Sequence, residues 1–169
     1  MNADLLREQL ASQHEALHDL GEGYPANHFA FQRIANALID ARATRLLEVG
    51  VGRGNALPLL VSLGLEVSAI DTSDEAVEAS RQRLSALGHD PGRVIQADIE
   101  DPITYAPLAA DGAFDAIVSL GVLPHVRHER QTLLNMRSLV RPGGEVYVEC
   151  RNKLFSLFTF NRYTYEFIM

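Results

Sequence analysis

Three residues near the amino terminus match a known zinc-binding pattern. The segment HEALHDLGEGY, residues 14–24, contains His14, Glu15 and His18 at the spacing H-E-x-x-H. In that pattern two histidines one helical turn apart hold zinc, and the glutamate acts as a general base. Tyr24 stands where the longer form has its third histidine. A five-residue match arises easily by chance, and no strand precedes it to hold a peptide substrate. We therefore expect a solvated helix face and no metal site.

A glycine-rich segment, LLEVGVGRGN at residues 46–55, is the second group that could do chemistry. Gly50, Gly52 and Gly54 lie between an apolar run and a helical pattern, where a missing Cβ lets the backbone approach a ligand closely. A dinucleotide-binding loop would have its third glycine at position 55, which is Asn55. A P-loop needs a Gly-Lys-Ser/Thr ending, which is absent. The segment has the position of a nucleotide-binding loop but the glycine spacing of neither phosphate binder.

The elements that must position this loop alternate between strands and helices. We expect helices over residues 4–20, 27–41, 56–64, 72–88 and 127–140, and strands over residues 45–50, 65–71, 93–97, 114–120 and 145–150. This alternation predicts parallel β-α-β units. Strands that are apolar almost throughout indicate a sheet covered on both faces.

Three local features are also expected. A capping box of Thr72 and Glu75 should open the helix over residues 72–88. Residues 101–112 should form a polar loop, and the Arg-Pro-Gly-Gly sequence at residues 141–144 should form a turn before the last strand.

Composition limits the class of protein. A length of 169 residues suits one domain with a full core. A formal net charge of −7 and the absence of any run of Lys or Arg argue against a nucleic-acid or anionic-membrane partner. No apolar run reaches the roughly 20 residues of a membrane-spanning helix, and no signal-peptide pattern is visible. The single Cys150 excludes an internal disulfide and is expected to be a passive, partly buried thiol. We expect a cytoplasmic protein.

The sequence E-x-G-x-G-x-G after the first expected strand resembles motif I of the class I S-adenosyl-L-methionine-dependent methyltransferases. The resemblance covers residues 46 to about 150 and continues at four stations in the family's order. These are Asp71 at the end of the second strand, QADIED after the third, FDAIVSLGVLPHV at the fourth, and LVRPGGEVYVEC leading into the fifth. It implies an α/β fold, Rossmann-like and doubly wound, with a mainly parallel sheet.

The resemblance also implies three parts of the chain. Residues 1–45 are expected to form an N-terminal helical cap or lid, residues 46–152 the cofactor-binding core, and residues 153–169 an aromatic-rich C-terminal segment. Members of this superfamily usually continue past strand five into two more strands. The last two strands are lacking here, so we expect an incomplete sheet, whether the chain is naturally short or part of a longer protein.

Roles for individual residues follow from the same resemblance. The motif I acid, here Glu48, supports the cofactor's cationic α-amino group, and Asp71 accepts hydrogen bonds from the two ribose hydroxyls. Asp98 meets the adenine amino group and Ile99 lines the adenine face, while the main chain near Leu120 faces the methionine moiety. The expected cofactor-binding residues are Glu48, Gly50, Gly52, Gly54, Asp71, Thr72, Asp98, Ile99 and Leu120.

The acceptor side is expected around His125. A histidine after the fourth strand recurs in small-molecule members such as the quinone-biosynthetic methyltransferases. Because imidazole titrates near neutral pH, it suits removal of a proton from a hydroxyl or amine. The alternative is that His125 caps the following helix or shapes the pocket wall. Tyr24 and His28, between the two N-terminal helices, are substrate or lid candidates.

We therefore expect a methyltransferase that uses S-adenosyl-L-methionine, releases S-adenosyl-L-homocysteine, and methylates an O or N atom of a small molecule. The expected partner is that small-molecule acceptor, and we expect neither a nucleic-acid nor a membrane partner. The chain could also form a homo-oligomer. The main alternative is a methyltransferase-like domain that binds the cofactor without competent catalysis, as a binding or regulatory module. A zinc peptidase and a nicotinamide oxidoreductase are further alternatives.

Overall fold

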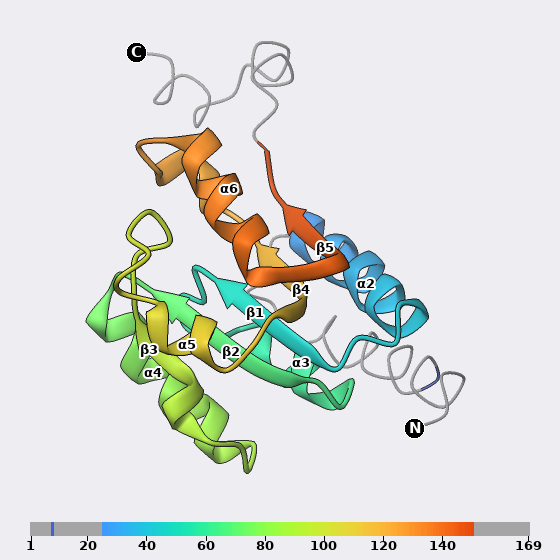
Figure 1. Ribbon diagram of the computed structural model, residues 1–169. Coiled ribbons are helices and arrows are strands. Elements are labelled where there is room, and N and C mark those ends of the chain that lie inside the picture. The colour runs from blue at the N-terminus through green and yellow to red at the C-terminus, as the bar shows by residue number, and fades with distance from the viewer. Residues whose placement is uncertain (1–7, 9–24, 151–169) are drawn as a thin grey trace, which may run out of the picture.

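A five-stranded parallel sheet with helices on both faces forms the centre of the computed structural model, which describes Glu8 and residues 25–150 (Figure 1). The strands are β1 (Arg45–Val49), β2 (Glu66–Asp71), β3 (Val94–Gln96), β4 (Phe114–Ser119) and β5 (Val140–Val148). The helices are α2 (Pro25–Asp40), α3 (Leu57–Ser62), α4 (Asp74–Ala86), α5 (Ala106–Ala110) and α6 (Glu129–Leu139), with 3-10 turns η1 (Pro91–Arg93) and η2 (Leu123–His125).

The strand order β3-β2-β1-β4-β5 makes this sheet doubly wound. The chain starts in the middle at β1, moves outward to β3, and returns to the other side of β1 at β4. All four pairings are parallel, so the carboxyl ends of the strands lie along one edge. In such sheets ligands bind outside that edge where the winding reverses, which here is between β1 and β4. The expected fold class is confirmed.

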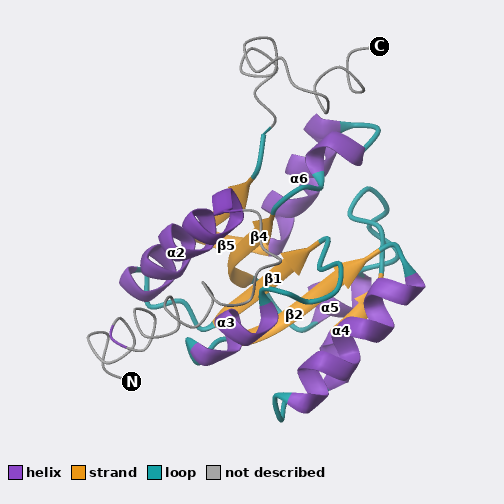
Figure 2. Ribbon diagram, turned by 180° about the vertical axis from the view of Figure 1, so that it is seen from behind, coloured by secondary structure: helices purple, strands orange, loops and turns teal. Residues whose placement is uncertain are grey.

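Two apolar layers hold the helices against the sheet. Because successive side chains of a strand point to opposite faces, Leu46 and Leu47 of β1 enter different layers. Leu46 packs with Leu38 of α2 and Leu57 of α3, and Figure 2 shows these two helices in front of the sheet. Leu47 packs with Met136 of α6 on the other face. Helix α2 is thus part of the core packing, and a lid role for residues 1–45 stays a prediction.

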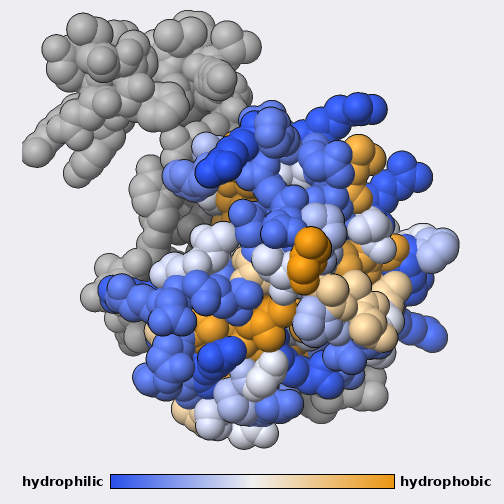
Figure 3. Space-filling view, turned by 60° about the vertical axis from the view of Figure 1, so that its left-hand side comes forward, coloured by the Kyte–Doolittle hydropathy of each residue, from blue (hydrophilic) through white to orange (hydrophobic). Residues whose placement is uncertain are grey.

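The outer surface on the side of β3 and α4 is mostly hydrophilic, with apolar residues in smaller groups (Figure 3). Among the described large apolar side chains, Ile103 is the one that is more than half exposed, at 83%. No described helix is both long enough and apolar enough to cross a bilayer.

Helix α4 begins differently from the expected capping box. Ser73 is the N-cap residue, and its side chain accepts a hydrogen bond from the Ala76 N–H at 3.3 Å. The Thr72/Glu75 box is therefore wrong by one residue. The reason lies in the preceding strand, because the Asp71 carboxylate accepts the Ser73 N–H at 2.9 Å and fixes how the chain enters the helix.

Residues 101–112 contain helix α5 rather than a loop alone. Tyr105 and Leu108, three residues apart, are 3% and 5% exposed and pack into the core. Pro107 lies in the first turn, where a missing N–H is tolerated. A helix of five residues is too short to produce a periodic pattern that the sequence could reveal.

Strand β5 starts earlier than expected and contains a bulge. Phe114 and Ala116 of β4, two residues apart, pair with Val140 and Glu145, five residues apart. Within the bulge, Gly144 lies so close to β4 that an added Cβ would be 2.5 Å from a main-chain carbonyl oxygen of that strand. The Arg-Pro-Gly-Gly sequence is thus an excursion inside β5 instead of a separate turn.

Cys150 is exposed, so the expected partly buried thiol is wrong. It lies two residues beyond Val148, the end of β5, and the second half of that strand is itself only partly covered. The apolar run before Cys150 therefore does not imply burial on an edge strand.

The carboxylate of Asp115 connects three strands at the amino-terminal edge of the sheet. Asp115 of β4 accepts the N–H groups of Thr44 and Arg45 at 2.7 and 2.9 Å, and Arg141 of β5 donates to its other oxygen at 2.5 Å. Burial alone raises the pKa of Asp115, but the Arg141 side chain and the two N–H groups outweigh it and hold the pKa well below its usual range. The carboxylate thus joins the starts of β1, β4 and β5.

Replacing this carboxylate by an amide, Asp115→Asn, should lower the free energy of unfolding by about 1–3 kcal/mol near neutral pH. Because the folded pKa is lowered, the contribution is present above the unfolded value of about 3.9 and is lost as the pH falls below it. Urea unfolding of both proteins should therefore show a difference that shrinks as the pH falls below about 4 toward the lowered folded pKa. Asp111→Asn, at an exposed position, is the control, and a pH-independent difference would contradict the role given to the carboxylate.

Candidate functional site

The glycine loop crosses the carboxyl edge of the sheet directly after β1. Gly50, Gly52 and Gly54 have φ angles of +77°, +54° and +70°, in the left-handed region that favours glycine. The N–H groups of Gly50 and Val51 donate to the Ile70 carbonyl at 2.9 and 3.1 Å. The loop therefore turns over the end of β2, as the glycine pattern indicates.

Asp71, the last residue of β2, holds the loop from the side. Its Oδ2 accepts the Gly52 N–H at 2.8 Å and its Oδ1 accepts the Ser73 N–H at 2.9 Å. Each carboxylate oxygen can accept a further bond, so both retain capacity for a diol. The structure thus gives Asp71 a loop-fixing role that the sequence did not predict, and its role toward ribose stays a prediction.

The three glycines differ in what surrounds them. An added Cβ on Gly54 would lie 2.7 Å from Cδ1 of Leu57 and 3.0 Å from Oγ of Ser80, and one on Gly50 would collide with Val122. On Gly52 it would meet no described residue within 4 Å. Gly50 and Gly54 are thus required by packing inside the protein, whereas no described side chain limits the space at Gly52.

A hollow of about 240 Å³ lies at this open face of the loop. Its lining residues come from the loop and the start of α4; they are Gly52, Arg53, Ser73, Glu75 and Ala76. Backbone with no side chain in front of it, beside a helix start and a strand-terminal carboxylate, is suited to receive a polar ligand.

Glu48 is a buried acid in the central strand of the sheet. It is 7% exposed, and its Oε2 makes no hydrogen bond within the described part of the chain. Burial, and to a smaller extent the charge of Asp71, raises the pKa of Glu48 to about 8. In register Glu48 lies opposite Val118 of β4, so it stands where the winding of the sheet reverses. A buried, unpaired carboxyl with a perturbed pKa is typical of a functional site, and it fits a cationic ligand group.

The candidate residues after β3 and β2 differ in how far their side chains are exposed at this edge of the sheet. Asp98 is half-buried, and its Oδ1 accepts the Glu100 N–H at 2.8 Å. Ile99 is 4% exposed and packs in the core, so little of its side chain faces outward. Thr72 is exposed, and its carbonyl accepts a bond from the Gln96 side chain at 3.1 Å. Contacts of these residues with a nucleobase or ribose stay predictions.

The end of β4 brings the acceptor-side candidate next to the glycine loop. Leu120 is half-buried, Val122 packs on Gly50, and η2 then ends at His125, which is exposed. The imidazole of His125 makes no hydrogen bond to another described residue. Helix α6 begins at Glu129 with no side-chain cap, so the idea that His125 caps this helix is wrong.

Several candidates fall outside the residues that can be described. Tyr24 lies there, as do His14, Glu15 and His18 of the zinc-like pattern. His28 belongs to α2, but the placement of its side chain is not described. Among the described residues, no group of three or more His, Cys, Asp or Glu side chains could hold a metal ion.

Two residues that support the site escaped the sequence prediction. Ser80 of α4 is fully buried and donates to the Gly52 carbonyl at 2.9 Å. Asn135 of α6 is 6% exposed and donates to the Ile99 carbonyl at 2.8 Å. The sequence does contain a sign of both residues, because each is a polar residue at a position where the helical pattern expects an apolar one.

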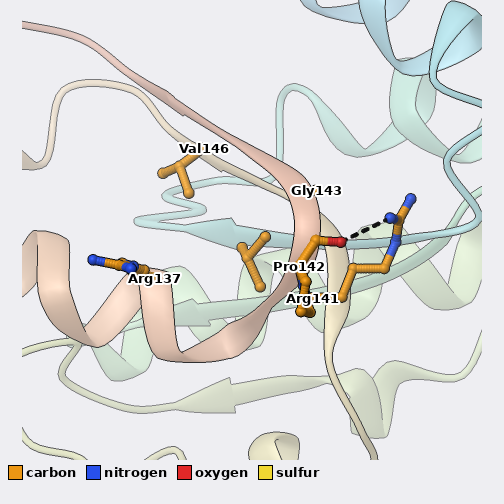
Figure 4. A pocket seen from close by; sticks show the side chains of 7 residues that line it. Arg137, Arg141, Pro142, Gly143 and Val146 are labelled. Carbon is orange, nitrogen blue, oxygen red and sulfur yellow. Dashed lines mark hydrogen bonds between the residues drawn. The ribbon is translucent and has the colours of Figure 1, made fainter.

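A larger hollow, about 380 Å³, lies elsewhere, at the amino end of β5. Arg137 and Arg141 are among its lining residues, but Figure 4 shows their side chains pointing in opposite directions. Arg141 is engaged with Asp115 and with the Pro142 carbonyl, the latter at 3.3 Å. This hollow lacks converging polar groups and contains none of the expected site residues.

The arrangement of sheet, glycine loop and strand-terminal acids defines a doubly wound α/β domain of the methyltransferase type. Residues 47–146 match the family described as "Methyltransferase domain". Since this match spans more than half of the chain, the chain belongs to the methyltransferase-domain family, and the resemblance to class I S-adenosyl-L-methionine-dependent methyltransferases is confirmed.

Two characterised relatives illustrate the family's range. The phosphatidylethanolamine N-methyltransferase of Cereibacter sphaeroides is 30% identical over 117 residues, 69% of this chain and 55% of that protein. The ubiquinone biosynthesis O-methyltransferase of Xanthomonas axonopodis pv. citri (strain 306) is 30% identical over 120 residues, 70% of this chain and 47% of that protein. The chain spans about half the length of these relatives.

Solved structures share the fold. The SAM-bound structure of an amino pentose methyltransferase from Micromonospora echinaspora, involved in calicheamicin biosynthesis, matches with a TM-score of 0.62 and 21% identity. The match covers 83% of this chain and 56% of that one. A glycopeptide N-methyltransferase complexed with sinefungin matches with a TM-score of 0.56 and 22% identity, over 70% of this chain and 53% of that one.

The raised pKa of Glu48 predicts an unusual pH dependence of stability. The folded state holds the Glu48 proton up to about pH 8, whereas an unfolded Glu releases it near 4.5. Wild-type stability should therefore fall as the pH rises through this window, by a few kcal/mol in total. Glu48→Gln carries no titrating group there and should gain stability relative to the wild type as the pH rises from 4.5 to about 8. Thermal unfolding across this range measures the gain; parallel curves for the two proteins within it would show that Glu48 is not a buried neutral acid.

Proposed function

We propose that this chain is the core of an S-adenosyl-L-methionine-dependent methyltransferase that methylates an oxygen or nitrogen atom of a small molecule. One observation carries the proposal. Asp71 holds the Gly52 backbone, which no described side chain covers, and β1 carries the buried Glu48, whose Oε2 has no partner among the described residues, at the point where the winding of a methyltransferase-family sheet reverses. The family assignment supports the reaction class, and this geometry supports the choice of site.

S-adenosyl-L-methionine is the methyl donor of the superfamily, and when bound it supplies an activated methyl group on a sulfonium. The chain's own groups suit a nucleoside without phosphate. The loop has no lysine, and its one basic residue, Arg53, points toward Glu75 with an N–O distance of 3.8 Å. Glu48 and Asp71 instead provide acidic groups, which favour an ammonium and a diol over a pyrophosphate.

Each site residue then has a distinct task. Glu48 receives the cationic α-amino group, and in doing so it gives up the proton that burial makes it retain. Asp71 accepts the ribose hydroxyls while it continues to hold the Gly52 N–H. Asp98 accepts the adenine amino group on the oxygen that does not receive the Glu100 N–H. Together these groups orient the donor, and orientation is the main contribution a protein makes to such a transfer.

The position of His125 and the names of the relatives support the proposal that the acceptor is an oxygen or nitrogen atom. Those two relatives are named as an N- and an O-methyltransferase, and an O–H or N–H acceptor must lose a proton when it is methylated. His125 is far from the glycine loop in sequence, but its turn contacts the loop through Val122. This supports a role for its exposed imidazole in taking that proton. The net charge of −7 favours a small acceptor over a nucleic acid.

Gly52→Ala tests the cofactor site. Gly52 and Gly88 both have positive φ, and an added Cβ on either meets no described residue, so Gly52→Ala and Gly88→Ala should lose a similar stability of about 1–2 kcal/mol. Only Gly52→Ala should weaken binding of S-adenosyl-L-homocysteine, by about ten-fold or more, because its methyl occupies the ligand's place. Calorimetric titration measures the binding. Wild-type protein that binds NAD(H) and not S-adenosyl-L-homocysteine would refute the proposed cofactor.

His125→Gln tests the acceptor side. With a general base removed, turnover of hydroxyl and amine acceptors should fall by about 100-fold or more, while the affinity for S-adenosyl-L-homocysteine stays within about two-fold. His89→Gln, at an exposed position after α4, is the matched control. Unchanged turnover would leave His125 as part of the pocket wall. Cofactor binding without transfer to any acceptor in the wild type would favour the non-catalytic alternative.

A further inference from the structure

The turn that carries His125 is held at both ends by the two loops expected to bind the cofactor. At its start, Val122 packs on Gly50 of the glycine loop, closely enough that no side chain fits on Gly50. The His125 N–H donates back to the Val122 carbonyl at 2.8 Å, which ties η2 to that anchor. The turn thus begins on the loop after β1.

At its end the turn is held by Glu100, from the segment after β3. Oε2 of Glu100 accepts the main-chain N–H of Arg127 at 2.9 Å, and Oε1 accepts that of His128 at 2.8 Å. Both carboxylate oxygens are therefore used on the two residues that lead from η2 into α6. The N–H of Arg127 first, and then that of His128, lower the pKa of Glu100 although burial opposes them, so the group is ionised when it makes these bonds.

The backbone around Glu100 is itself fixed by the segment expected to bind adenine. The Glu100 N–H donates to Oδ1 of Asp98 at 2.8 Å. The neighbouring Ile99 carbonyl accepts from the buried Asn135 side chain of α6 at 2.8 Å, and Gln131 donates to the other end of that amide at 2.9 Å. A ligand that bonds to Asp98 therefore touches a residue one hydrogen bond away from Glu100.

We propose that Glu100 is a positioning residue that couples cofactor binding to the placement of His125. The inference rests on the proposed function and deepens it, because it states how the acceptor side responds to the cofactor side. A nucleoside on Asp98 fixes residues 98–100, Glu100 then fixes Arg127 and His128, and these fix the carboxyl end of the turn. In this arrangement a bound donor restricts the motion of the turn that carries the acceptor's base.

Amide hydrogen exchange with S-adenosyl-L-homocysteine as the probe tests the coupling. In the wild type, the ligand should slow exchange in residues 50–54 and also in residues 122–128. In Glu100→Ala the slowing at residues 50–54 should persist, and the slowing at residues 122–128 should be lost, with exchange there about ten-fold faster than in the liganded wild type.

Asp101→Ala is the matched control. Asp101 is the next residue in the same loop, but the hydrogen bond of its carboxylate, to the Ile103 N–H at 3.1 Å, stays within that loop. It should behave as the wild type. Glu100→Gln keeps one acceptor oxygen and should retain part of the slowing, and it also serves if Glu100→Ala fails to fold. Turnover at saturating donor and acceptor should fall at least about ten-fold in Glu100→Ala, with ligand affinity changed less than about three-fold.

The outcomes separate this inference from the proposed function. Slowing at both segments in the wild type and in Asp101→Ala, but only at residues 50–54 in Glu100→Ala, supports the coupling. Slowing at both segments in Glu100→Ala, or at residues 50–54 alone in the wild type, overturns the coupling and leaves the proposed function standing. No slowing at either segment in the wild type overturns the proposed function and this inference with it.

Discussion

The hydrogen bond from the Gly52 N–H to the Asp71 carboxylate joins the first two strands at the edge where the site lies. Three glycines with positive φ would leave the loop many conformations, because glycine loses more conformational freedom on folding than any other residue. Three contacts restrict the loop to one of them. Asp71 accepts the Gly52 N–H, Ser80 donates to the Gly52 carbonyl, and Val122 packs against Gly50. The shape of the loop is therefore decided by residues from β2, α4 and the turn after β4.

The same carboxylate sets the electrostatics of the site. Asp71 and Glu48 are both acids, and the charge of Asp71 adds to the effect of burial in raising the pKa of Glu48. A ligand with a positive charge relieves this repulsion, whereas a pyrophosphate adds to it. The two acids therefore support the proposed preference for a cationic nucleoside over a dinucleotide.

Residue type and order were enough to predict the doubly wound sheet and the place of the glycine loop, because parallel strands bring their carboxyl ends together whatever the details. They were not enough to predict which groups hold the loop. Ser80 and Asn135 occupy positions that periodicity assigns to apolar residues, and their partners are main-chain groups far away in the sequence. The local capping pattern also failed at the start of α4, because the hydrogen bond from the Ser73 N–H to Asp71 makes Ser73 the N-cap residue. The five-residue helix α5 was too short to be visible, and exposure of Cys150 follows from the edge position of β5.

The bulge in β5 has a consequence for how the sheet can grow. Where a step of two residues along β4 corresponds to a step of five along β5, the outer row of main-chain donors and acceptors loses its regular spacing. A strand from another molecule that approaches the first half of β5 finds no continuous template, which is a common protection of sheet edges against aggregation. The regular ladder resumes at Glu145 and runs to Val148. Any strand that extends the sheet on this side is thereby directed to that short stretch, which fixes the register in which it can join.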